Sequence, residues 1–286
     1  MREPVLVASM DGVGTKLKIA FAMNRHNTVG ADLVNHCVND IAVVGARPLF
    51  FLDYIGCEKL EPRVFQQLLR GFSRACRSAG CALLGGETAQ MPGMYRKDEY
   101  DLAGCIIGVV ERRGIINGSK IRPDDVILGL ESNGLHTNGY SLAREILFAR
   151  MRLKINSRLP GSTTAVGEEL LRVHKNYQPL LAKIPSGMIK GLAHITGGGL
   201  IDNLPRILPA NCDGVIETKS WRVPRIFQIL QQNGNIDPQE MYQVFNMGVG
   251  MVAIVSKADA KRATSLLRAK RIGRIDRGTG KTHLVF

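Results

Sequence analysis

Short polar side chains recur between residues 28 and 45 of this 286-residue sequence. Four of them follow steps of four, three and one, which places them on one stripe of a helix: Asp32, His36, Asn39 and Asp40. The stretch contains no Lys, Arg or Glu, although the solvated side of a helix usually carries such longer side chains. Mg²⁺ takes oxygen ligands and is commonly held by one or two carboxylates together with nucleotide phosphates. We therefore favour a metal and phosphate site over a solvated helix surface.

A second group of candidates lies in the hexapeptide Asp-Gly-Val-Gly-Thr-Lys at residues 11–16, directly after a predicted strand over 5–9. Glycines let the backbone approach a phosphate, Lys16 offers a positive charge, and Asp11 can join a metal shell. The spacing is not that of a Walker A loop. A single glycine-rich hexapeptide is equally compatible with an ordinary tight turn.

Further glycine-rich loops follow later predicted strands. The strand 81–84 leads into a predicted turn at 85–88, and the strand 126–130 leads into the loop 132–140, which contains His136. His136 is either a catalytic base or a loop residue bonded to its neighbours, and the sequence favours the second. Three glycines at 197–199 stand at a predicted helix start, where backbone N–H groups and the helix dipole attract an anion. Phosphate is the ligand we expect there.

These residues are positioned by an alternation of strands and helices. The first polar stripe lies beside an apolar stripe of three- and four-residue period, and Gly45 and Pro48 end that helix. Other helices are predicted over 62–78 and 141–150, and other strands over 49–55, 102–110 and 252–255. The polar stretch 117–125 resembles a connection between domains. We therefore expect one domain over 1–118 and a second over 119–286.

Composition limits the class of protein. The net charge of +13 favours anionic partners, but the basic residues are scattered and not interleaved with aromatics, so specific nucleic-acid binding is the weaker inference. The six cysteines include no Cys-x-x-Cys pair and lie in apolar segments, which is typical of buried thiols in a reducing compartment. No apolar run approaches the ~20 residues of a membrane span, and the start is unlike a signal peptide. We expect a cytoplasmic protein without a membrane partner.

Several motifs together resemble the family of phosphoribosylformylglycinamidine cyclo-ligases, also called aminoimidazole ribonucleotide synthetases. They span nearly the whole chain: DGVGTK at 11–16, CVND at 37–40, PLFFLDY at 48–54, GGETAQMPGMY at 85–95, HITGGG at 194–199 and FNMGVG at 245–250. The resemblance implies conversion of formylglycinamidine ribonucleotide to aminoimidazole ribonucleotide in purine biosynthesis, with release of ADP and phosphate from ATP. It also implies an α+β fold of two domains, an N-terminal sheet domain that forms a homodimer and a C-terminal α/β sandwich, with ATP near the dimer interface.

The resemblance also assigns residues by position. On the nucleotide side it places Asp11, Gly12, Gly14, Thr15, Lys16, Asn39, Asp40, Gly45 and Pro48. On the side of the ribonucleotide substrate it places Gly86, Glu87, Thr88, His136, Asn138, His194, Thr196, Gly197, Gly198 and Gly199. We expect Lys16, Asp40 and His194 to be catalytic and Mg²⁺ to be held by Asp11, Asp32 and Asp40. Phosphoryl transfer needs aligned phosphates and neutralised charge, so no covalent residue is named.

The chain departs from the family pattern at a few places. Arg47 and Gln90 each stand where the family usually has Glu, and Val-His-Lys-Asn-Tyr at 173–177 replaces a Pro-Thr-Arg-Ile-Tyr-like run. Family members usually carry a further glycine-rich N-terminal segment, and this chain begins at the strand that follows it. Two alternatives stay open: an ATP-dependent small-molecule kinase of the same superfamily, and a truncated, non-catalytic homologue. The Met-Pro-Gly-Met-Tyr run at 91–95 favours the cyclo-ligase over the kinase.

Overall fold

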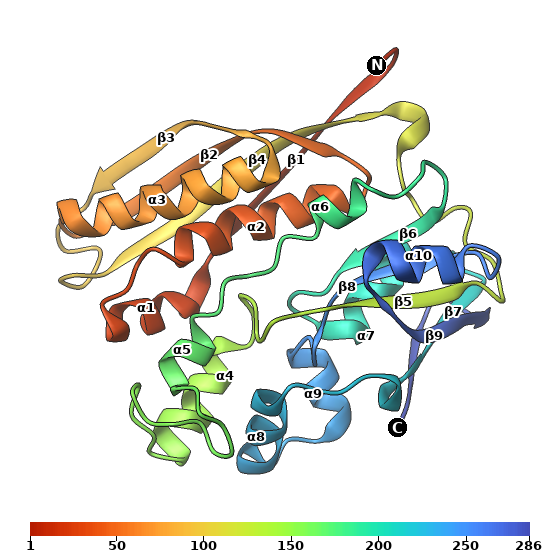
Figure 1. Cartoon of the computed structure of the whole chain (residues 1–286). Coiled ribbons are helices and arrows are strands. Elements are labelled where there is room, and N and C mark those ends of the chain that lie inside the picture. The colour runs from red at the N-terminus through yellow and green to blue at the C-terminus, as the bar shows by residue number, and fades with distance from the viewer.

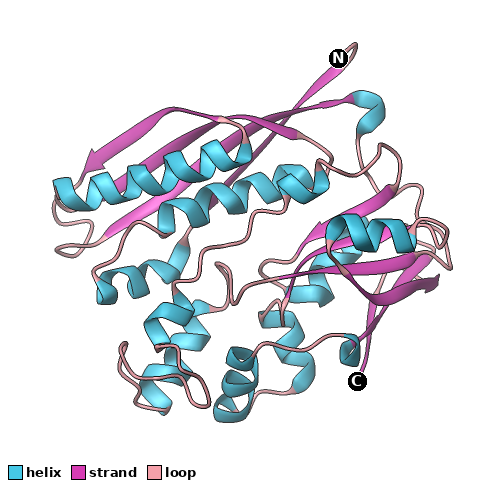
Figure 2. Cartoon of the chain, viewed as in Figure 1, coloured by secondary structure: helices cyan, strands magenta, loops and turns pink.

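The computed structural model describes all 286 residues and contains two β-sheets with helices packed against them (Figures 1 and 2). One sheet has four strands in the order β1-β4-β2-β3, and the other has six in the order β10-β7-β9-β5-β8-β6. The first sheet uses residues up to 111 and the second begins at residue 126. The predicted α+β class is confirmed, and the predicted boundary at 118 falls in the connection between the sheets.

The first sheet is built from β1 (Pro4–Gly12), β2 (Arg47–Cys57), β3 (Ala82–Gln90) and β4 (Tyr100–Glu111). Strand β4 is antiparallel to both β1 and β2, whereas β3 is parallel to β2. Helices α2 (Val29–Ala42) and α3 (Pro62–Ala79) cover one face of this sheet, and the short α1 (Leu17–Met23) precedes them (Figure 1). The apolar stripe of α2, with Val34, Val38 and Ile41, is fully buried. The predicted helices and strands of this half are confirmed.

The predicted turn at 85–88 is wrong, because these residues lie inside β3 and pair with β2. Their glycines serve strand pairing. A Cβ atom on Gly86 would lie 1.9 Å from the backbone oxygen of Asp53, so only glycine permits this close approach.

The second sheet is built from β5 (Val126–Glu131), β6 (Ile189–His194), β7 (Cys212–Glu217), β8 (Val249–Val255), β9 (Lys270–Arg277) and β10 (Thr282–Val285). Its helices are α4 (Tyr140–Arg144), α5 (Val166–Leu170), α6 (Gln178–Leu181), α7 (Gly199–Asn203), α8 (Arg225–Gly234), α9 (Pro238–Val244) and α10 (Ala260–Leu267). A π-helical turn, Glu145–Arg150, continues α4, so residues 141–150 are helical as predicted. The predicted strand over 252–255 is the second half of β8.

The two halves are joined along α2. An extended segment, residues 172–177, leaves α5 and runs beside α2 before α6 begins (Figure 1). We call it the strap. Asn35 and Asn39 each donate a side-chain N–H to a strap carbonyl, and Asp32 and Asn39 accept backbone N–H groups from the strap. The polar stripe of α2 is therefore largely an interface with the second half of the chain.

No helix in the structure combines the length and the apolar character that a bilayer crossing requires.

Candidate functional site

Two carboxylates from different elements meet beside α2. Asp11 is the last residue but one of β1, and Asp40 lies in the last turn of α2, four residues after His36. Nε2 of His36 lies 2.9 Å from Oδ2 of Asp11 and 3.8 Å from Oδ2 of Asp40. Ser9 donates its hydroxyl to Asp40 Oδ2 at 3.0 Å. Two of the three predicted Mg²⁺ ligands, Asp11 and Asp40, thus lie on either side of one imidazole.

The second half contributes His194 to this cluster. His194 is the last residue of β6, and its Nδ1 lies 2.8 Å from Oδ1 of Asp40. Its Nε2 lies 3.0 Å from Nε2 of His174 in the strap. All three histidines are buried, whereas the Asp40 side chain keeps 25% of its surface exposed. Asp40 is therefore a solvent-accessible group in contact with the buried imidazoles.

The protein shifts the pKa values of the residues in this cluster in different directions. Burial raises the pKa of Asp11, but the hydrogen bond and charge of His36 outweigh it, so this pKa lies below its usual value. Burial lowers the pKa of His36, but the carboxylates of Asp11 and Asp40 raise it by more, so the net pKa lies above its usual value. For His194 burial prevails over Asp40 and the pKa is lowered. These shifts favour an anionic Asp11 and a neutral His194.

A cavity of about 300 Å³ opens beside Asp40 and His194. Its polar lining also includes Thr196, Asn203 and Arg206, the last of which is its one Lys or Arg side chain. Nearby, Nδ2 of Asn138 is buried without a hydrogen-bond partner, and a Cβ atom on Gly197 would lie 3.5 Å from Asn138 Oδ1. A buried donor without an acceptor is costly unless a ligand or water completes it. Of the predicted substrate residues, Thr196 lines this cavity, Gly197 accepts a hydrogen bond from Asn203 of the lining, and Asn138 lies beside Gly197.

The glycine run differs in detail from the expectation. The N–H of Gly199 donates to the carbonyl of Thr196, and α7 has only five residues, so its dipole adds little to anion binding. Gly198 has φ of +94° and Gly199 has φ of +57°. A Cβ atom on Gly199 would lie 2.0 Å from the Tyr242 carbonyl oxygen. These two glycines therefore shape the turn.

The predicted roles of Lys16 and Asp32 are not supported. Both side chains are fully buried, with Lys16 Nζ 2.8 Å from Asp32 Oδ1. Nζ also donates to the carbonyls of His136 and Arg172, so its three N–H groups are all used. Lys16 therefore has no donor left for a nucleotide in this structure, and Asp32 lies in an ion pair rather than in a metal shell with Asp11 and Asp40.

The side chains of Asn39 and His136 are also held by contacts within the protein. Both ends of the Asn39 amide are bonded to the strap, through the Lys175 carbonyl and the Tyr177 N–H, so this side chain is held against the strap. The His136 ring is fully buried, both its nitrogens lack partners, and it stacks on His174 at 4.1 Å between centroids. Burial and the neighbouring charges hold the pKa of His136 well below its usual value. It is a neutral packing residue here.

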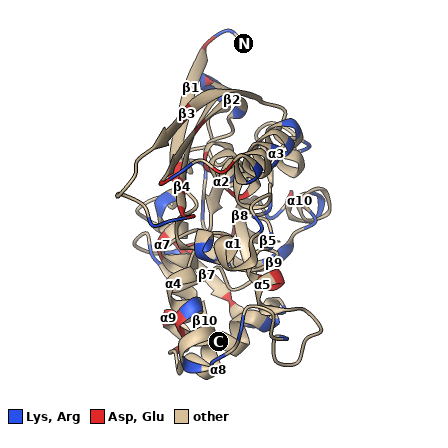
Figure 3. Cartoon of the chain, turned by 90° about the vertical axis from the view of Figure 1, so that its left-hand side faces the viewer, with Lys and Arg blue, Asp and Glu red and all other residues tan.

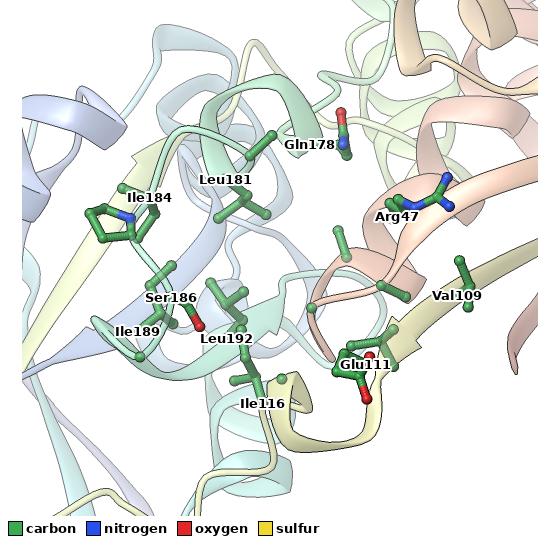
Figure 4. A pocket seen from close by; sticks show the side chains of 18 of the residues that line it. Arg47, Val109, Glu111, Ile116, Gln178, Leu181, Ile184, Ser186, Ile189 and Leu192 are labelled. Carbon is green, nitrogen blue, oxygen red and sulfur yellow. The ribbon is translucent and has the colours of Figure 1, made fainter. Parts of the chain in front are cut away.

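The remaining nucleotide candidates are spread along the first half. Gly12 donates its N–H to Asp11, Gly14 has φ of +66° with open space where a side chain would lie, and the Thr15 hydroxyl lies 3.2 Å from that of Ser141. Pro48 is buried near the start of β2. Gly45 lines a cavity of about 340 Å³ between β2, β4 and the segment after α6 (Figure 4). Leu192 lines this cavity and also the one beside Asp40.

Gly86, Glu87 and Thr88 lie on β3, at the opposite edge of the first sheet from β1 and Asp11. Within one chain the structure does not bring them to the cavity beside Asp40.

Two family models together cover almost the whole chain. The model described as AIR synthase related protein, N-terminal domain, matches residues 2–110, and the corresponding C-terminal domain matches residues 122–285. A phosphoribosylformylglycinamidine cyclo-ligase of Trichlorobacter lovleyi is 54% identical over 93% of this chain and 76% of its own length. One of Syntrophus aciditrophicus is 49% identical over 100% of this chain and 84% of its own. The chain belongs to the phosphoribosylformylglycinamidine cyclo-ligase family.

Solved structures show the same fold at much lower identity. Hydrogenase maturation protein HypE aligns with a TM-score of 0.70 and 19% identity, over 98% of this chain and 84% of its own. Thiamine monophosphate kinase from Aquifex aeolicus aligns with a TM-score of 0.68 and 17% identity, over 99% of this chain and 90% of its own. These likenesses show the fold of the chain and say nothing further about the reaction.

Sequence reasoning assigned no individual role to several residues of the site. His36 was placed on the polar stripe four residues before Asp40, but the stripe did not show that it contacts Asp11. His174 lies in the run that departs from the cyclo-ligase pattern, so the departure itself marked the position. Ser9 and Arg206 gave no signal, because only the fold places them beside Asp40.

Proposed function

We propose that this chain catalyses the ATP-dependent ring closure of formylglycinamidine ribonucleotide to aminoimidazole ribonucleotide, with release of ADP and phosphate. The observation that carries the proposal is the convergence of Asp40 and His194 on the cavity lined by Thr196 and Arg206, with Asp11 joined to Asp40 through His36. Identity of 54% to a cyclo-ligase supports the same reaction. The kinase alternative is supported only by likeness of fold.

The site divides the work between the two halves. We propose that residues 1–118 hold the nucleotide and residues 119–286 the ribonucleotide, whose phosphate lies near Arg206, Asn138 and Gly197. Charge supports this division, because residues 119–286 contain 24 Lys and Arg against 13 Asp and Glu, whereas residues 1–118 contain 14 against 12. The basic positions are distributed over the elements rather than gathered in one stripe (Figure 3). This distribution of basic residues suits a small anion that binds in a pocket.

Mg²⁺ fits the two carboxylates. Asp11 and Asp40 converge from β1 and α2, and each carboxylate oxygen can accept more than the single hydrogen bond it receives here. When bound, Mg²⁺ would neutralise phosphate charge during transfer. Asp32 is not part of this set, because its Oδ1 is occupied by Lys16 and a strap N–H. His36 and His194 orient the two carboxylates.

Replacement of one carboxylate tests the proposal. Asp40→Asn keeps the shape but removes a charge that balances the cation, so ADP release with formylglycinamidine ribonucleotide should fall at least about a hundredfold. Asp276→Asn, which alters a surface ion pair with Arg274 on β9, is the matched control and should stay near the wild-type rate. A coupled ADP assay measures both. An Asp40→Asn enzyme with the same turnover as Asp276→Asn would refute the assignment.

A further inference from the structure

Two imidazoles and a carboxylate face a common point beside α2. One ligand atom from each of His36, Asp40 and His194 lies within 4.8 Å of the other two. His36 and Asp40 come from one face of α2, and His194 is held at the end of β6, where it pairs with Met251 of β8. Oδ2 of Asp11 lies 2.9 Å from His36 Nε2, at the edge of the same group. Four donor groups are thus supplied by three elements of regular structure.

The far nitrogen of each imidazole is already bonded. Nδ1 of His36 lies 2.7 Å from the Thr137 hydroxyl, and Nε2 of His194 lies 3.0 Å from Nε2 of His174. These partners turn Nε2 of His36 and Nδ1 of His194 toward Asp40. Histidines that ligate metals in proteins nearly always have their second ring nitrogen fixed in this way. The outer partners His174 and Thr137 are therefore arranged as a metal site requires.

The donor chemistry selects the class of ion. Mg²⁺ prefers oxygen ligands in octahedral geometry, whereas imidazole nitrogen suits Zn²⁺, Co²⁺ and other borderline divalent ions. Zinc–nitrogen bonds of about 2.0–2.1 Å need the three atoms to move inward by less than about 1 Å. We propose that His36, Asp40 and His194, with Asp11 as a fourth ligand, form a binding site for a borderline divalent transition-metal ion. The cavity beside Asp40 leaves one side of that ion open.

This inference shares Asp11 and Asp40 with the proposed nucleotide site but requires neither ATP nor the ribonucleotide. It also predicts competition, because an ion bound at Asp40 excludes Mg²⁺ from the same carboxylate. Zn²⁺ should therefore inhibit Mg²⁺-dependent ADP release at concentrations far below that of Mg²⁺.

Cobalt absorption tests the binding directly. The full chain, stripped with a chelator and titrated with Co²⁺ without nucleotide, should develop visible d–d bands that saturate at about one ion per chain. His36→Gln and His194→Gln should each weaken Co²⁺ binding at least about tenfold, whereas His283→Gln, at an exposed histidine paired with Asp213 on another sheet edge, should not. Melting curves without metal show whether each variant is folded.

A second measurement does not depend on the variants. X-ray absorption of the wild-type chain loaded with Zn²⁺ should show two imidazole ligands. Absence of d–d bands at one equivalent of Co²⁺, or a zinc shell without imidazole, would overturn the proposal. Because Co²⁺ binding is measured without ATP, and ADP release is measured with Mg²⁺ alone, either proposal can fail while the other stands.

Discussion

Lys16 and Asp32 form an ion pair that solvent does not reach, with both side chains at 0% exposure. The ammonium also donates to carbonyls of His136 and Arg172 in the second half of the chain. Asp32 in turn accepts the backbone N–H of His174. One lysine therefore ties α2, the loop before α4 and the strap together, and its charge is compensated only while all of these are in place.

Loss of the Lys16 ammonium should be strongly destabilising. Lys16→Met keeps most of the side-chain volume but leaves the Asp32 carboxylate buried without its counter-charge, which should cost about 3–5 kcal/mol of unfolding free energy. Lys18→Met is the matched control, since Lys18 is 35% exposed in its pair with Glu99 and should cost less than about 1 kcal/mol. Urea unfolding of both variants measures the difference. Equal losses would show that the buried pair contributes no more than a surface pair.

The sequence predicted which polar side chains lie on one stripe of α2 better than it predicted what those side chains bind. The spacing of Asp32, Asn39 and Asp40 placed them correctly on one stripe of α2. Asp32 bonds to a residue 142 positions away and Asn39 to one 138 positions away. No local pattern distinguishes a short polar side chain that awaits a metal from one that binds an extended segment of backbone. Unlike Asp32 and Asn39, Asp40 makes its hydrogen bonds to Ser9 and His194 rather than to the strap.

Helices α2 and α3 pack at very close range through glycine. A Cβ atom on Gly30 would lie 2.7 Å from the Leu68 carbonyl oxygen, and one on Gly71 would lie 3.1 Å from the Ala31 nitrogen. This contact sets the position of α2, and with it the position of Asp40 relative to β1. The amphipathic pattern predicted both helices, but it cannot report how closely two helices approach.

Gly30→Ala should therefore reverse the usual sign of a helical Gly→Ala substitution. Such a change normally stabilises a helix by about 0.5–1 kcal/mol. Here the added methyl group meets backbone atoms of α3 that cannot move away, so unfolding free energy should fall by about 1–3 kcal/mol. Gly114→Ala is the control, because its Cβ atom would have no neighbour closer than 3.8 Å. Thermal melting of both variants is sufficient, and a stabilised Gly30→Ala would contradict the packing argument.

The molecule as a whole leaves one face of its first sheet uncovered. Helices α2 and α3 lie on the other face (Figure 1). Leu6 and Met10 of β1 are each 71% exposed and Leu84 of β3 is 62% exposed. Exposed apolar side chains gathered on one sheet face are typical of an interface between proteins. We propose that a second copy of the chain covers this face, as the predicted homodimer requires.

Dimerisation through this face also accounts for the position of residues 86–88. Within one chain they lie on the sheet edge opposite to Asp11. In a two-fold pair of such sheets, the β3 edge of one copy can lie near the β1 edge of the other. Glu87 would then reach the partner's site rather than its own. The sequence motif alone does not indicate whether residues 86–88 serve their own chain or a partner chain.

Paired variants test the shared site. Leu6→Glu with Met10→Glu should give monomers by sedimentation, whereas Val285→Glu, at an exposed apolar residue of β10, should leave the dimer intact. Asp40→Asn and Glu87→Gln should each be inactive alone. When the two are unfolded, mixed equally and refolded, half of the dimers are mixed, and each mixed dimer has one site with both native residues. ADP release should therefore recover to about a quarter of the wild-type rate. If each site instead takes Asp40 and Glu87 from the same chain, every site in the mixture carries a substitution and no activity returns.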